Sequence, residues 1–496
     1  MPAPSRLPMI TQTVLVVLLC WALSPAGAPQ DLLAANVLRI GVAANTPVNL
    51  DPHMSAGTDA VVAEMVFNGL LRYKPGNSAV IEPDLATAIP KPKTEGGKQV
   101  WTFTLRKGVM FQPGPTFPAY ELTSDDVVYS LQKAADPMRS AYAGRYAGMT
   151  FKTQGPYSVQ VVLDRPLSAT LFLPRFADRA GGAIICRKAA LKLSAEDFQR
   201  FPIGTGPFTF KTYSAGLGIE LASHNAYFRG APLLDGVEVV YMPDFAACEQ
   251  AYQRGELQMM CGQRSSRWAQ KAAQWGNTKV DIFGPAESLC LAFNTASGPF
   301  SDKLMRQAVA YALNRSEFVD LFGASVAERL YASVPPDITG GVGEQEIRSL
   351  GLDYDTDLFR AQEMLRQAGV TARRNLPIEL TGQASDRFLY TMLKKQLGRV
   401  GIDLVMAEPE SGTTTEEVRP RDQALEFRWA QADTADEVLE SLVARENMHV
   451  STRTEGFVTG YRKVDVLLEA ARRETGLKKQ QDIWRHAQLK LLQDMA

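Results

Sequence analysis

Between Ser288 and Arg315 the hydrophobic pattern changes from that of a strand to that of a helix, and this change constrains the fold more than any other feature. The run SLCLAFN predicts a buried strand, and the Ser-Gly-Pro that follows predicts a turn. Asp302 stands where the positive end of a helix dipole favours an acid. Two rows of apolar residues then recur at four-residue spacing: Leu304, Ala308 and Ala312, and beside them Met305, Val309 and Leu313. We therefore expect a strand, a turn and a half-buried helix where the chain passes from one lobe into another.

Length and charge narrow the class of protein. At 496 residues the chain is expected to form several domains. Its 45% hydrophobic and 22% charged residues are typical of a soluble globular protein. The 53 basic and 54 acidic residues nearly balance, which argues against a nucleic-acid partner because such proteins carry a basic excess. A receptor for a small molecule remains compatible with this composition.

The amino-terminal segment has the features of a secretory signal peptide. Arg6 precedes an apolar run from Met9 to Leu23, and small residues end the segment at Ala28. A membrane anchor is the alternative, but polar residues at positions 11–13 interrupt the run. The run is also shorter than the roughly 20 residues that a membrane span needs. We expect removal of residues 1–28 and a mature protein in the periplasm.

The common motifs of hydrolases and phosphate-binding proteins are missing from the sequence. Neither Gly-x-Ser-x-Gly nor His-Glu-x-x-His occurs, and the chain has only four histidines. His53 lacks a partner at metal-ligand spacing, so a surface or turn role is expected. The Gly204-Thr205-Gly206 turn is not followed by the Lys-Ser/Thr of a phosphate loop. We therefore expect no enzymatic activity and no cofactor.

Four cysteines follow the signal segment: Cys186, Cys248, Cys261 and Cys290. In an oxidising compartment they allow up to two disulfides in three pairings, and free buried thiols are the alternative. Since spacing alone does not select a pair, the pairing stays open.

The residues of the 288–315 stretch resemble those of the extracytoplasmic solute-binding proteins of peptide-type ABC importers, a family that binds dipeptides, oligopeptides and nickel. The matching residues are Phe293-Asn294, Pro299-Phe300, Asp302, Arg306-Gln307-Ala308 and Ala310-Tyr311-Ala312-Leu313. Further runs in the family's order include Leu50-Asp51-Pro52-His53, Gly204-Thr205-Gly206-Pro207 and Gly230-Ala231-Pro232. The resemblance covers about residues 38 to 495.

This resemblance implies an α/β, two-lobed fold like that of type II periplasmic binding proteins, with an additional subdomain in the first lobe. It divides the chain into the signal peptide (1–28), the first part of lobe I (29–77), the additional subdomain (78–203), the second part of lobe I (204–285), lobe II (286–469) and a return to lobe I (470–496). Relatives continue with further strands of lobe I, so we expect this return to be incomplete.

The resemblance also implies a function. A monomer is expected to capture a peptide-like solute in the cleft between its lobes and to deliver it to the membrane permease of an ABC transporter. A nickel complex, an amine or an oligosaccharide is the alternative solute, and a sensor with the same fold is the alternative role.

The segment from Leu425 to Asp436 holds the main ligand-binding candidates. In the family a Trp followed shortly by Ala-Asp-Tyr occupies this place, and in peptide-binding members that Asp pairs with the ligand's α-ammonium group. Asp433 matches this acid. We expect Trp429 to supply a flat apolar wall and Arg428 to meet a ligand carboxylate in fork geometry.

Two features qualify this assignment. The residues after Asp433 are Thr-Ala-Asp-Glu where the family has Tyr-Pro-Asp-Pro, and Trp429 stands one residue farther from the acid than is usual. A non-peptide solute and a helix-capping role for Asp433 therefore remain alternatives. In relatives the loop that matches Gly57 and Thr58 approaches the ligand with backbone groups, so both residues are also candidates.

Overall fold

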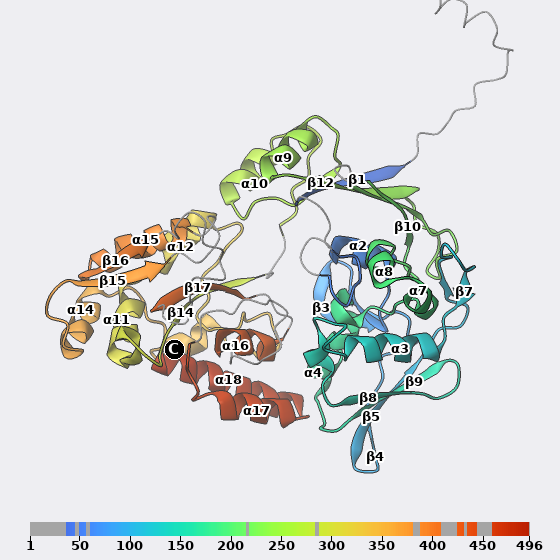
Figure 1. Ribbon diagram of the computed structural model, residues 1–496. Helices are drawn as coiled ribbons and strands as arrows, with labels where there is room; N and C mark the ends of the chain where they lie inside the picture. The colour runs from blue at the N-terminus through green and yellow to red at the C-terminus, as the bar shows by residue number, and fades with distance from the viewer. Residues whose placement is uncertain are drawn as a thin grey trace, which may run out of the picture.

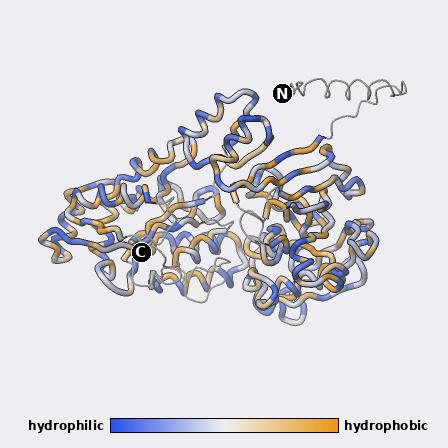
Figure 2. The backbone as a smooth tube through the Cα atoms, turned by 45° about the horizontal axis from the view of Figure 1, so that its top comes forward, coloured by the Kyte–Doolittle hydropathy of each residue, from blue (hydrophilic) through white to orange (hydrophobic). Residues whose placement is uncertain are grey.

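The computed structural model describes residues 36–44, 49–55, 60–214, 218–282, 287–379, 387–407, 424–430, 434–443 and 459–495. Figure 1 shows two lobes side by side, one built from the blue to green part of the chain and the other from the yellow to red part. Along most elements in Figure 2 apolar and polar residues alternate, as expected where one face of each element is buried. The expected two-lobed α/β fold is confirmed.

The first lobe is organised around a five-stranded mixed sheet in the order β10-β11-β12-β1-β13. Its strands are β1 (Val37–Ala43), β10 (Phe208–Ser214), β11 (Gly218–Ser223), β12 (Gly236–Met242) and β13 (Met259–Met260). Strand β1 lies between β12 and the edge strand β13 and runs parallel to both. Because β13 is an edge strand, the chain leaves this sheet at its border and continues toward the second lobe.

The additional subdomain contains a four-stranded sheet in the order β4-β5-β9-β8, with antiparallel pairing throughout. Its strands are β4 (Lys93–Glu95), β5 (Lys98–Thr104), β8 (Met149–Thr153) and β9 (Ser158–Leu163). Trp101 and Phe103 of β5 are buried and alternate with exposed threonines, so one face of this strand is buried. Helix α3 (Ser124–Ala134) begins with a capping box, in which Asp126 Oδ2 accepts a hydrogen bond from the Thr123 amide at 3.0 Å.

Shorter elements complete the first lobe. They are α2 (Ala60–Val66), β2 (Leu71–Lys74), β3 (Asn77–Pro83), β6 (Met110–Phe111), β7 (Tyr120–Glu121), η2 (Ala143–Tyr146), α4 (Ala169–Phe172), α5 (Pro174–Ala177), α6 (Arg179–Gly182), α7 (Arg187–Lys192), α8 (Ala195–Arg200), α9 (Phe245–Gln253) and α10 (Ser266–Ala272). The Gly204–Gly206 turn lies against α2, where a Cβ on Gly204 would approach Val66 O to 2.0 Å. These glycines therefore serve close backbone packing rather than phosphate binding.

The second lobe starts with the expected strand, turn and helix. Strand β14 (Ser288–Phe293) is followed by η3 (Pro299–Ser301) and by α11 (Lys303–Ala312). Asp302 is the N-cap of α11, and its Oδ1 accepts a hydrogen bond from the Leu304 amide at 2.8 Å. The remaining elements are α12 (Arg315–Phe322), α13 (Glu344–Ser349), α14 (Leu358–Gln367), β15 (Arg374–Glu379), α15 (Arg387–Gly398), β16 (Ile402–Ala407), β17 (Leu425–Ala430), α16 (Ala435–Val443), α17 (Asp465–Arg473) and α18 (Leu477–Asp494).

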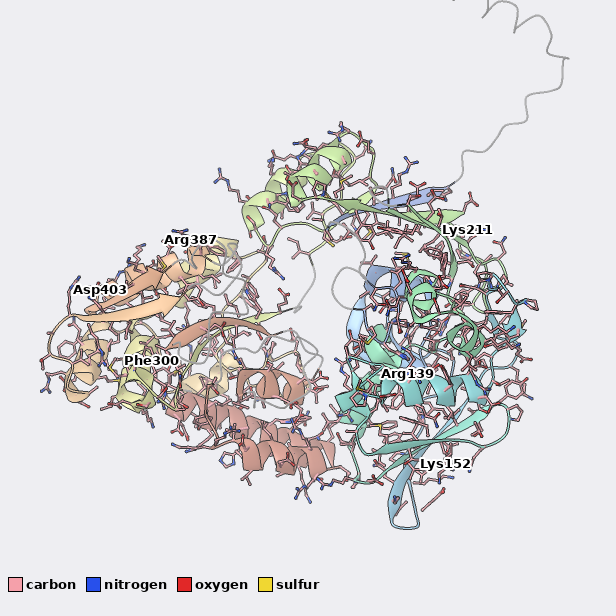
Figure 3. The ribbon with its side chains drawn as sticks, in the orientation of Figure 1. Arg139, Lys152, Lys211, Phe300, Arg387 and Asp403 are labelled. Atoms are coloured by element: carbon pink, nitrogen blue, oxygen red, sulfur yellow. The ribbon has the colours of Figure 1, made fainter. Side chains whose placement is uncertain are left out.

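The last helix belongs to the second lobe. Arg306 of α11 donates from Nη2 to Asp494 O at 2.8 Å and from Nη1 to the carbonyl of Phe300, a buried residue labelled in Figure 3, at 2.6 Å. Tyr354 Oη donates to Leu492 O at 3.0 Å. The expectation that residues 470–496 return to the first lobe is therefore wrong for α18, because these donors satisfy its terminal carbonyls from within lobe II.

The lobes also contact each other through α4, away from the edge strand β13 where the chain leaves the first sheet. Leu171 of α4 is only 5% exposed because it joins the apolar cluster of α16, α17 and α18. Burial lowers the pKa of Arg175 in the neighbouring helix α5. The negative charges of Glu437 and Asp436 in α16 act in the opposite direction and raise this pKa. Figure 1 shows α4 next to the ends of these second-lobe helices. The lobes thus meet through apolar packing supported by opposite charges.

The four cysteines Cys186, Cys248, Cys261 and Cys290 are free thiols in the structure, and only Cys261 is exposed.

Candidate functional site

The candidate site is centred on a two-stranded antiparallel ribbon at the start of the second lobe. Strands β14 and β17 pair so that Leu289 lies opposite Trp429 and Cys290 opposite Arg428. Since successive strand residues point to opposite faces, Trp429 and Arg428 serve different sides of the ribbon. The sequence pattern showed neither that both residues stand on one short strand nor that their side chains face apart.

The indole of Trp429 is half-buried and has two neighbours of different origin. The ring of Phe322, at the end of α12, meets it edge-on at 6.0 Å between centroids and 88° between planes. On another side the guanidinium carbon of Arg264 lies 4.9 Å from the ring centroid, a cation–π distance. Arg264 follows β13, so this contact joins the border of the first lobe to the second.

Arg428 is engaged within the second lobe. Its Nη1 donates to Ser441 O in α16 at 2.9 Å, and its Nε lies 3.5 Å from Glu426 Oε2. Burial lowers the pKa of Arg428 and raises the pKa of Glu426. The opposite charge of the partner residue reduces each of these two shifts. Arg428 therefore holds α16 against the ribbon, and these partners were not predictable from the sequence pattern.

Three of the predicted site residues, Asp433, Gly57 and Thr58, lie outside the described residues. The structure does describe Thr434, which directly precedes α16. Its Oγ1 accepts a hydrogen bond from the Glu437 amide at 3.2 Å, as an N-cap side chain does. Thr434 therefore caps α16, and both the ligand-binding and the capping role of Asp433 stay predictions.

The chain that leads to Gly57 and Thr58 is anchored by a buried ionic cluster. Lys133 Nζ of α3 lies 2.7 Å from Asp51 Oδ2, and both side chains are 6% exposed. His53 is fully buried, with Nε2 at 2.9 Å from Ala183 O and Nδ1 at 3.3 Å from Lys133 Nζ. The expected surface role of His53 is thus wrong, although the residue does lie in a turn.

The protonation of His53 follows from this environment. Burial, and then the charge of Lys133, lower the pKa of His53 to about 4. The neutral ring donates from Nε2 to the Ala183 carbonyl and accepts from the lysine at Nδ1. Together with the Tyr142 hydroxyl, which donates to Ser55 O at 2.5 Å, the cluster fixes the chain up to residue 55.

Two cavities are lined by described residues, one within each lobe. A cavity of about 360 Å³ lies beside α14 and the end of α15, and one of about 220 Å³ lies beside Gln112 and Phe210. Neither is lined by Trp429 or Arg264, so we assign the solute to neither.

Among the residues whose positions the structure gives, no three His, Cys, Asp or Glu side chains are grouped so that they could hold a metal ion. None of the helices in the described part of the chain combines the length and the apolar character needed to cross a membrane.

Comparison with solved structures shows the same fold. The binding protein MoaA from A. tumefaciens R10, solved with mannopinic acid, is 28% identical with a TM-score of 0.73, covering 93% of this chain and 92% of that chain. The binding protein DppA from Helicobacter pylori, solved with the peptide STSA, is 22% identical with a TM-score of 0.72, covering 92% and 91%.

Comparison of sequences identifies the family. Di/tripeptide-binding protein 2 of Pseudomonas aeruginosa is 27% identical over 348 residues, which span 65% of this chain and only 62% of that protein. Residues 80–444 match the family described as bacterial extracellular solute-binding proteins, family 5, middle region. The match covers most of the chain and agrees with the motifs around Arg306. The chain therefore belongs to the bacterial extracellular solute-binding proteins of family 5.

Proposed function

We propose that this protein is a periplasmic receptor that captures a peptide-like solute between its two lobes and presents it to the permease of an ABC transporter. Membership of family 5 and the two-lobed fold support this role. Relatives named as di- and tripeptide-binding proteins support the solute class. In this proposal residues 1–28 direct export, the mature protein is a monomer, and the solute leaves chemically unchanged.

One observation carries the proposal, namely the contact of Arg264 with Trp429. It places an aromatic wall beside a cationic group where the chain passes from one lobe to the other. A small peptide offers matching chemistry, with apolar side chains for the indole and charged ends for ionic groups. A buried charged end needs an opposite charge, because the loss of its hydration is otherwise too costly. Asp433 is proposed to meet the ammonium end.

The proposal is tested by mass spectrometry of the ligand released from the protein after purification under non-denaturing conditions. We expect short peptides with free termini. Loss of peptide uptake after deletion of the gene would separate transport from a sensory role, in which uptake is unchanged. Recovery of a single non-peptide solute would contradict the proposed substrate class.

A second solute class has its own support. The structure that shares 28% identity over 93% of the chain was solved with mannopinic acid, whereas the peptide complex from Helicobacter pylori shares 22% over 92%. An acidic, non-peptide solute is therefore the second candidate. A competition assay distinguishes these two solute classes. Unlabelled mannopinic acid and unlabelled peptide are each used to displace a bound labelled peptide, and the compound that does so at the lower concentration belongs to the preferred class.

A further inference from the structure

We propose that Arg264 contacts the solute and recognises its carboxylate group. This inference rests on the proposed function, because it specifies how the same receptor would select a solute with an acidic end. It also replaces Arg428 in the role that the sequence suggested for that residue.

The position of Arg264 favours a ligand-binding role. It stands four residues after the end of β13, the edge strand that runs parallel to β1. In open α/β sheets, ligands bind beyond the carboxyl ends of parallel strands, where the loops gather. Glu287, which pairs with Arg264, directly precedes β14 of the second lobe. Arg264 therefore lies between the carboxyl ends of the parallel strands in the first lobe and the first strand of the second lobe.

The contacts of Arg264 orient its guanidinium group without covering it. Nη2 donates to Glu287 Oε1 at 2.6 Å, and the guanidinium carbon Cζ lies 4.9 Å from the centre of the Trp429 ring. The side chain is nevertheless 64% exposed. A guanidinium carries five N–H donors, so one hydrogen bond to Glu287 leaves others for a ligand. The contact with the indole and the bond to Glu287 restrain the guanidinium in advance, which lowers the entropic cost of binding a carboxylate.

Arg428, on the same strand as Trp429, contrasts with Arg264. Its side chain is 17% exposed, it already pairs with Glu426, and it already donates a hydrogen bond to the Ser441 carbonyl. To bind a solute it would have to leave buried partners, which would then lack a donor. Arg264 can bind a carboxylate while keeping both of its neighbours. The geometry therefore separates a structural arginine from one that is available to a solute.

The test compares two ligands on four proteins, the wild type and three variants, by calorimetry, using the mature protein freed of co-purified ligand. The ligands are the dipeptide Ala-Ala and its carboxyl-terminal amide. The variants are Arg264→Met, which keeps an apolar stem over Trp429, and Arg267→Met, which removes an exposed charge three residues away. Thermal melting confirms that each variant is folded. Arg264→Lys is added because lysine keeps the positive charge but lacks the planar guanidinium that can donate two parallel hydrogen bonds to a carboxylate.

We expect the wild-type protein to prefer the free acid over the amide by about 10- to 100-fold, the strength of a charge-assisted pair. Arg264→Met should abolish this preference, Arg264→Lys should restore part of it, and Arg267→Met should leave it intact. If Arg264→Met weakens both ligands equally, Arg264 is only a brace between the lobes and the inference is wrong. An unchanged preference also contradicts it. If the wild-type protein binds neither ligand, the proposed peptide function fails first, and the inference falls with it.

Discussion

Lys133 and Asp51 form a buried ion pair, with Nζ 2.7 Å from Oδ2, although they stand 82 residues apart in the chain. The pair ties α3 of the additional subdomain to the turn that precedes residues 56–59. The pair therefore connects the subdomain to the described chain that precedes the candidate residues Gly57 and Thr58.

Removal of the lysine charge should destabilise the first lobe. In Lys133→Met the Asp51 carboxylate stays buried without its partner, so we expect a loss of about 3 to 5 kcal/mol in the free energy of unfolding. Urea denaturation measures this loss. The matched control is Lys152→Met on β8, an exposed lysine labelled in Figure 3, for which we expect a change within about 0.5 kcal/mol. Equal effects of the two substitutions would show that the buried pair contributes nothing specific.

His53 should make the protein sensitive to mild acid. Its pKa is about 4 in the folded protein, below the usual value of 6.5, so the unfolded chain binds the proton more readily. The stabilisation is therefore fully present above pH 6.5 and is lost as the pH falls toward 4. The difference amounts to about 3 kcal/mol.

The comparison of wild-type protein with His53→Gln isolates this contribution. Glutamine keeps a donor for the Ala183 carbonyl and does not titrate. The difference in unfolding free energy between the two proteins should change between pH 7 and pH 4, and a constant difference across this range would contradict the assignment.

Local features of the structure were predictable from the sequence. The strand and helix on either side of Pro299 were predicted correctly, because periodicity depends on residues within one or two turns. The family resemblance, carried by local motifs such as Arg306-Gln307-Ala308, was confirmed in the same way.

Contacts between distant segments were not predictable. The pattern of α18 showed that one face is buried but not which lobe covers it, and Arg306 settles this by binding Asp494 O. Likewise nothing in the sequence linked Arg264 to Trp429, or Lys133 to His53. Such pairs are set by tertiary packing, which a pattern within one element does not encode.

The contact of Leu171 with the second lobe should favour the closed arrangement of the lobes. Leu171→Ala removes part of its buried apolar area, so the closed form should be less populated and solutes should bind about tenfold more weakly. The loss should be the same for every solute, since Leu171 acts on closure and not on recognition. Calorimetry measures affinity, and small-angle X-ray scattering measures the mean opening of the ligand-free protein.

Leu191→Ala is the control for Leu171, because Leu191 is 63% exposed on α7 of the same lobe. It should leave affinity and compactness unchanged. A loss for Leu171→Ala that differs between solutes would place this residue in the binding site instead.

Asp433 is predicted to pair with the solute's amino terminus. Asp433→Ala should weaken binding of a peptide with a free amine by about 2 to 5 kcal/mol, as expected for a broken buried charge pair. An N-acetylated peptide should be affected far less. Asp403→Asn on β16, labelled in Figure 3, removes a charge paired with Arg373 and should not affect binding. Equal losses for the free and the acetylated peptide would remove Asp433 from the site.

The central claim is that the two lobes hold a peptide and release it unaltered. The most direct measurement is calorimetric titration of the ligand-free mature protein with di- and tripeptides, followed by mass spectrometry of the peptide recovered from the calorimeter's sample chamber. The account predicts saturable binding of one peptide per chain and complete recovery of intact peptide. No binding of any peptide, or recovery of free amino acids in its place, would contradict it.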